Sequence, residues 1–169
     1  MKTKWLLILW AVTCSSMAGY LFFTSPDEVC EQKIIYDEAA DGSRQISAAL
    51  SQARREHKLV LLQFGANWCG WCQRIHCFFN SDKPVRTELA NHYLVVLVDV
   101  NNGRNASVVE HYGHPTALGL PVIVLLSADG RRLVTQGTGE WVNPDAGNYD
   151  SAKILAFLKT WLKTSEAHR

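Results

Sequence analysis

The sequence lacks an excess of basic charge, internal repeats and low-complexity tracts. It contains 17 lysines and arginines against 16 aspartates and glutamates. Two of the lysines, Lys2 and Lys4, precede an apolar N-terminal run, so the remainder of the chain has 15 basic and 16 acidic residues. Because proteins that bind nucleic acid carry clusters of positive charge, no nucleic acid is expected as a partner.

Cysteine is scarce as well, because five cysteines in 169 residues are too few for a scaffold held together by disulfides. The length suffices for one ordinary domain whose core needs no such staples, together with an appendage. Hydrophobic residues make up 47% of the chain and charged residues 20%, as in globular proteins. The cysteines are therefore expected to have specific tasks.

Charged residues are absent from residues 5–23, which follow Lys2 and Lys4. Three roles remain open for this run: a cleaved signal peptide with a small-residue cleavage site at 16–18, an uncleaved membrane anchor, or a segment lipidated at Cys14 in a poorly matching motif. In each case the two lysines keep the N-terminus in the cytoplasm. The rest of the chain is therefore expected outside it.

The chain is expected to divide into a signal peptide or membrane anchor at 1–25, a linker at 26–40 and a folded domain at 41–165. The linker is predicted to end in a short strand at 33–36. Residues 166–169 are not an endoplasmic reticulum retrieval signal. We therefore interpret the chain as a bacterial protein of the periplasm, or of another extracytoplasmic compartment.

Hydrophobic periodicity predicts helices and strands in alternation along the domain. This order implies an α/β fold with a central mixed sheet flanked by helices. An Asp-Gly pair at 129–130 predicts a hairpin turn between the last two strands. The predicted helices are 41–57, 69–79, 84–91, 107–112 and 154–162, and the predicted strands are 58–64, 93–100, 121–126 and 131–136.

The most informative motif is WCGWC at residues 68–72, directly after the apolar run 59–64. Two thiols two residues apart at a strand-to-helix junction lie within one helical turn, close enough to form a disulfide and to separate again. Cys69, at the helix N-terminus, meets unpaired backbone N–H groups and the positive end of the helix dipole. These stabilise the thiolate, which is the nucleophilic form. The motif therefore predicts thiol–disulfide exchange.

Three features within residues 36–163 give the sequence a resemblance to the thioredoxin superfamily. They are FGANWCGWC at 64–72, GLP at 119–121 opening a strand, and the ADG turn at 128–130. The sequence is most similar to secreted bacterial thioredoxin-like proteins with a WCxxC active site. The resemblance implies that residues 41–165 form a thioredoxin-like domain.

The resemblance also implies roles for individual residues. Cys69 is expected to be the exposed catalytic nucleophile and Cys72 the buried thiol that resolves the mixed disulfide. Pro121 is expected to be a cis-proline that faces the two cysteines, since only X-Pro bonds adopt cis at low cost. Leu120, just before it, is expected to hydrogen-bond an extended substrate segment.

The sequence departs from the family pattern at two places. Gln63 stands six residues before Cys69, where thioredoxins carry a buried aspartate, and an amide cannot take a proton from the buried thiol. Gly70 and Trp71 separate the cysteines in place of the usual Gly-Pro, Pro-His or Gly-His. Trp71 and its neighbour Trp68 are expected to shape the substrate surface beside the thiols.

A metal site is the competing interpretation of the cysteine cluster. Zinc sites usually draw ligand pairs from separate elements. Here Cys69, Cys72, His76 and Cys77 crowd one helix, and Cys77 is rotated off the shared face, so no metal is expected. A c-type haem is excluded because Gln73, not histidine, follows the second cysteine.

Two further cysteines leave alternatives open. Cys77 is expected to pack in the core as a small hydrophobic residue. Cys30 could pair with Cys77, pair with a partner protein, or remain unpaired.

Together these features predict a periplasmic thiol–disulfide oxidoreductase that needs no cofactor besides its Cys69–Cys72 pair. Its expected partners are protein thiols and disulfides and a redox partner, and a monomer is expected. Residues 5–23 would provide any membrane anchoring. Since a fold does not determine a function, one alternative stays open: a non-catalytic binding module whose CxxC is a structural disulfide or metal clip.

Overall fold

The computed structural model describes residues 34–166. The predicted signal or anchor segment, Cys14, Cys30 and the start of the predicted strand at 33–36 lie outside the described residues. Across residues 34–166, no helix is long and apolar enough to cross a membrane.

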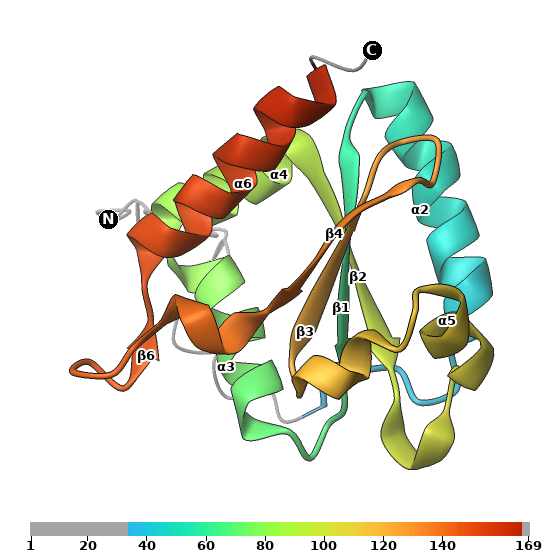
Figure 1. Ribbon diagram of the computed structural model, residues 1–169, viewed down its shortest axis with the longest axis horizontal. Coiled ribbons are helices and arrows are strands. Elements are labelled where there is room, and N and C mark those ends of the chain that lie inside the picture. Colours follow the sequence, from blue (N-terminus) through green and yellow to red (C-terminus); the bar gives the residue numbers. More distant parts are fainter. Residues whose placement is uncertain (1–33, 167–169) are drawn as a thin grey trace, which may run out of the picture.

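A four-stranded mixed sheet forms the centre of the domain (Figure 1). Its order is β2 (Tyr93–Asp99), β1 (Leu59–Gly65), β3 (Val122–Leu126) and β4 (Arg132–Gly137). β1 runs parallel to β2, with Leu59 opposite Tyr93, and antiparallel to β3, which in turn pairs antiparallel with β4. The α/β class and the mixed sheet predicted from the sequence are confirmed.

Helices cover both faces of this sheet (Figure 1). On one face lie α2 (Gly42–Glu56) and α5 (Ala106–His111). The other face carries α3 (Gly70–Ser81), α4 (Lys83–His92) and α6 (Ser151–Glu166). The strand between the two layers must therefore be apolar on both sides.

β1 meets this requirement except at one position: all seven of its residues are buried, and Gln63 is the polar one among them. Successive side chains of a strand point to opposite faces. Leu62 and Phe64 therefore pack under α2 and α5, whereas Leu59 and Leu61 pack under α3, α4 and α6. This buried strand ends at Gly65, four residues before the first cysteine of the CxxC motif.

Side-chain caps determine where two of the helices begin. The Asp41 carboxylate accepts a hydrogen bond from the Arg44 N–H at the start of α2. The Asp82 carboxylate accepts one from the Val85 N–H, 3.0 Å away, and so starts α4, with Pro84 in the first turn. Aspartate at the N-cap and proline in the first turn are both favoured at helix starts. A new helix therefore begins where α3 ends.

The predicted strand at 33–36 is wrong for the residues that the structure describes, because Ile34, Ile35 and Tyr36 form no strand. The Ile35 and Tyr36 N–H groups donate instead to the side-chain oxygen of Asn67, each at 2.9 Å. One asparagine side chain thus satisfies backbone groups that a neighbouring strand would have paired. Ile34 is 79% exposed, so the apolar pair Ile34–Ile35 does not mark a buried strand.

The segment after β4, predicted as a loop, also contains regular structure. A 3₁₀ turn at Thr138–Trp141 leads into a small hairpin of β5 (Val142–Asn143) and β6 (Asn148–Tyr149). Figure 1 shows this hairpin beside α3. This segment therefore reaches the helix that follows Cys69.

Candidate active site

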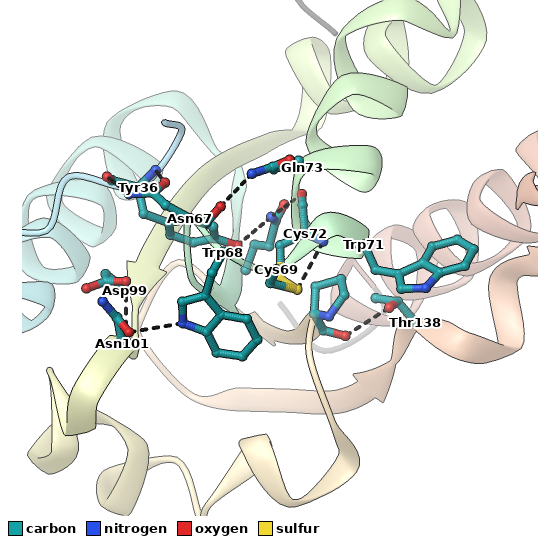
Figure 2. The surroundings of a disulfide bond; sticks show 12 residues. Tyr36, Asn67, Trp68, Cys69, Trp71, Cys72, Gln73, Asp99, Asn101 and Thr138 are labelled. Atoms are coloured by element: carbon teal, nitrogen blue, oxygen red, sulfur yellow. Dashed lines mark hydrogen bonds between the residues drawn. A yellow bond between two sulfur atoms is a disulfide. The ribbon is translucent and has the colours of Figure 1, made fainter. Parts of the chain in front are cut away.

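The two motif cysteines lie at the junction of β1 and α3 and form a disulfide (Figure 2). Cys69 is the N-cap of α3, and its sulfur accepts a hydrogen bond from the Cys72 N–H at 3.2 Å. Their Cα atoms are 5.2 Å apart. The helix N-terminus thus directs a backbone N–H group at the first sulfur, where it would stabilise a thiolate.

The two cysteines differ in their access to solvent. Cys69 is 6% exposed, whereas Cys72 is completely buried. The flanking tryptophans are far more open, with Trp68 70% exposed and Trp71 40% exposed. A disulfide of another protein can therefore approach Cys69 across an aromatic surface but cannot reach Cys72.

Both tryptophans are held in place by specific contacts. The Trp68 indole N–H donates to the side-chain oxygen of Asn101 at 3.0 Å (Figure 2). The Arg74 guanidinium lies 4.5 Å from the centre of the Trp71 ring, and the Tyr149 ring packs edge-on against that ring at 5.6 Å. Because Tyr149 belongs to β6, the hairpin after β4 supports one side of the exposed surface.

The chain segment before β3 supplies the opposite wall. The Leu120–Pro121 peptide bond is cis, and the Pro121 carbonyl accepts a hydrogen bond from the Thr138 hydroxyl at 2.8 Å. Leu120 packs against the cluster formed by Cys69, Cys72 and a buried tyrosine. The structure therefore brings Leu120 beside the disulfide, although 48 residues separate it from Cys72.

Gln63 is fully buried behind the disulfide. Its side-chain NH₂ group donates to the Tyr36 hydroxyl oxygen at 2.7 Å and to the Cys72 carbonyl oxygen at 3.3 Å. The residue that replaces the family's aspartate therefore does adjoin the second cysteine. It contacts that cysteine as a hydrogen-bond donor.

Tyr36 and Asn67 complete this inner side and were not singled out in the sequence. Asn67 accepts from the Tyr36 N–H and donates to the Tyr36 carbonyl at 3.0 Å (Figure 2). Asn67 is part of the FGANWC motif, but no local pattern connects it with a residue 31 positions earlier. Burial raises the pKa of the Tyr36 hydroxyl above its ordinary value, so this group stays protonated at neutral pH.

Asp99 adds a buried carboxyl group near Tyr36 (Figure 2). One of its oxygens accepts from the Asn101 N–H at 3.3 Å, and the other lies 3.7 Å from the Arg104 guanidinium. Burial raises the pKa of this carboxyl group, while the Asn101 N–H and the Arg104 charge oppose that rise. The buried carboxyl group of this site is therefore carried by β2, and not by the position six residues before Cys69.

The other residues of the cysteine cluster have different surroundings. His76 is half-buried, burial lowers its pKa, and its ring nitrogen lies 3.4 Å from the Asn80 amide. Cys77 is half-buried and disulfide-bonded, so the expectation that it packs in the core as a small hydrophobic residue was wrong. In the part of the chain that the structure describes, no three His, Cys, Asp or Glu side chains are grouped to hold a metal ion.

A CxxC disulfide at the N-terminus of a helix, after the central strand of a mixed sheet, defines the class of thiol–disulfide oxidoreductases with a thioredoxin-like fold. The comparisons agree. A family model described as thioredoxin-like matches residues 41–128, and the chain therefore belongs to the thioredoxin-like family.

The relatives are disulfide-exchange proteins by name. The crystal structure of a disulphide isomerase from Xylella fastidiosa is 33% identical, with a TM-score of 0.66 over 76% of this chain and 97% of that one. The thiol:disulfide interchange protein DsbD of Yersinia pestis is 32% identical over 116 residues, which are 68% of this chain. That match spans only 18% of the DsbD protein. A thioredoxin from Thermus thermophilus, 22% identical with a TM-score of 0.55 over 72% of this chain and 86% of that one, shares the fold.

Proposed function

We propose that the protein is an extracytoplasmic thiol–disulfide oxidoreductase that exchanges disulfides with other proteins through Cys69 and Cys72. The observation that carries the proposal is the disulfide at the start of α3, in which Cys69 is 6% exposed and Cys72 is completely buried. Such an asymmetry separates the two roles that disulfide exchange requires. One sulfur must react with the substrate, and the other must be inaccessible to the substrate until it attacks the mixed disulfide.

In the reduced protein, the Cys69 thiolate attacks one sulfur of a substrate disulfide. A mixed disulfide forms between Cys69 and the substrate, and the second substrate sulfur leaves as a thiolate that takes up a proton. Cys72 then loses its proton and attacks the Cys69 sulfur. The remaining substrate thiol is released, and the Cys69–Cys72 disulfide is left for a dithiol donor to reduce.

The surroundings of Cys69 support a protein as the substrate. Trp68, Trp71 and Leu118 are exposed large apolar side chains. The two tryptophans flank the cysteines in sequence, and Leu118 lies two residues before Leu120, which packs against them. Aromatic residues in particular are enriched where proteins contact one another. The names of the relatives, a disulphide isomerase and a thiol:disulfide interchange protein, point to the same kind of partner.

The extracytoplasmic location rests on the sequence. Residues 5–23 carry no charge and follow two lysines, the pattern of a signal peptide or an N-terminal anchor. A reporter enzyme that is active only in the periplasm, fused after the full chain, is expected to be active in bacteria. The same fusion starting at residue 27 should be silent, and equal signals from both would contradict the location.

Insulin reduction tests the activity itself. The full chain, added to insulin and dithiothreitol, is expected to accelerate the precipitation of the reduced insulin chains. Cys77→Ser is the control for the loss of a cysteine in general and should remain active. A variant carrying both Cys69→Ser and Cys77→Ser should be inactive. If the full chain does not accelerate the reaction, the CxxC motif is structural and the protein is a binding module.

A further inference from the structure

Gly65, at the end of β1, leaves a space that two other groups occupy. A β-carbon on this glycine would lie 2.6 Å from the Cys72 sulfur and closer still to the Tyr36 hydroxyl oxygen. Both atoms thus lie close to the same β-carbon position, so the Tyr36 hydroxyl group lies beside the sulfur of the buried cysteine. Any residue with a side chain at position 65 would separate them.

Gln63 determines how the Tyr36 hydroxyl is oriented. The Cys72 carbonyl oxygen can only accept hydrogen bonds, so the end of the Gln63 amide that faces it must be the NH₂ group. The same nitrogen contacts the Tyr36 hydroxyl oxygen, which therefore accepts there. Within residues 34–166 this is the one hydrogen bond of the hydroxyl group, and its own proton is available to the sulfur beside it.

Asn67 holds Tyr36 in this position. Its amide oxygen accepts from the N–H groups of Ile35 and Tyr36, and its NH₂ group donates to the Tyr36 carbonyl and to the Glu38 carboxylate at 3.1 Å. The segment that carries Tyr36 precedes residues 41–128, which match the family. Tyr36 therefore lies just before the residues that match the family model.

We infer that Tyr36 is a positioning residue that donates its hydroxyl hydrogen bond to the Cys72 thiolate and so promotes resolution of the mixed disulfide. This inference rests on the proposed function. A buried thiolate without a donor is costly to form, because burial disfavours the charged state. Hydrogen bonds to charged groups are shorter and stronger than neutral ones, so this donor lowers the pKa of the Cys72 thiol.

The hydroxyl group supports the step without exchanging its own proton. Burial keeps Tyr36 protonated, so it acts as a donor and not as a base. The Cys72 proton goes to water, the Cys72 thiolate attacks the Cys69 sulfur, and the substrate thiolate leaves and takes up a proton. The same hydrogen bond stabilises the Cys72 thiolate that leaves when a donor thiol reduces the disulfide at Cys69.

A two-phase release experiment tests this role on the full chain. The reduced protein is mixed with dithiobis(nitrobenzoate), whose thiolate product is coloured. Attack by Cys69 releases the first thiolate, and attack by Cys72 on the resulting mixed disulfide releases the second in a unimolecular phase. Cys72→Ser identifies the second phase, because that variant lacks it.

Tyr36→Phe is expected to slow the second phase by about tenfold at pH 7, which is typical of losing a hydrogen bond to a charged group. Its pH profile should shift to higher pH, while the first phase stays unchanged. The neighbouring titratable groups remain in place in this variant, namely Cys69, Glu38, Asp99, Arg104, His76 and Tyr149. Tyr112→Phe, a buried tyrosine in the other core, is the matched control and should resolve at the wild-type rate.

The outcomes separate this inference from the proposed function. If wild type shows no first phase, the proposed function fails. If both phases are present and Tyr36→Phe matches wild type in rate and pH profile, the role of Tyr36 is overturned. Should Tyr36→Phe fail to fold, fluorotyrosine at position 36, a stronger acid and a better donor, is expected to shift the second-phase profile to lower pH, and an unshifted profile refutes the role.

Discussion

Cys69→Ser is expected to reduce the rate of insulin reduction to that of dithiothreitol alone. A serine hydroxyl stays protonated at neutral pH and cannot replace a thiolate as the nucleophile toward sulfur. Cys72 cannot take over, because it is fully buried beneath Cys69, with Leu120 packed against the pair. Turbidity measured with equal amounts of variant and wild-type protein checks this result.

Cys72→Ser should fail in a different way. Cys69 still attacks the substrate, but no second thiol releases it, so a covalent complex with insulin accumulates. Non-reducing electrophoresis and mass spectrometry would detect this complex, and dithiothreitol should separate it by reducing the mixed disulfide. Wild-type turnover by Cys69→Ser, or an equal yield of complex from both variants, would contradict the assigned roles.

Gly65→Ala is expected to be the most damaging small substitution in the described part of the chain. The new methyl group would overlap the Tyr36 hydroxyl and lie 2.6 Å from the Cys72 sulfur. Tyr36 cannot move aside easily, because it is buried and Asn67 bonds its backbone on both sides. We expect a loss of about 3 kcal/mol in the free energy of unfolding and a melting temperature lower by about 10 °C.

Gly139→Ala is the matched control for that measurement. A β-carbon at Gly139 meets no atom within 4 Å, so this variant should melt like wild type. A double-mutant cycle with Tyr36→Ala identifies the clash, because removing the ring should reduce the cost of Gly65→Ala. If Gly65→Ala melts at the wild-type temperature, the space between Tyr36 and Cys72 is larger than the structure shows.

The elements of the fold could be predicted from local sequence patterns. The apolar run that forms β1, the aspartate before α2 and the Asp-Gly turn before β4 act over a few residues, and each lies where it was expected. The CxxC spacing likewise places both sulfurs in the first turn of α3. The predicted strand at 33–36 was wrong because its partner is a side chain and not another strand.

The sequence by itself determined that this protein is a mixed α/β domain with a redox-active cysteine pair, since helix periodicity, strand burial and CxxC spacing are local properties. Only the tertiary structure decided which groups surround the buried sulfur. Tyr36 reaches Cys72 because β1 ends in a glycine and because Asn67 binds the backbone of a segment 31 residues earlier. Such contacts depend on how segments far apart in the sequence pack together, and the local sequence pattern of either segment does not predict them.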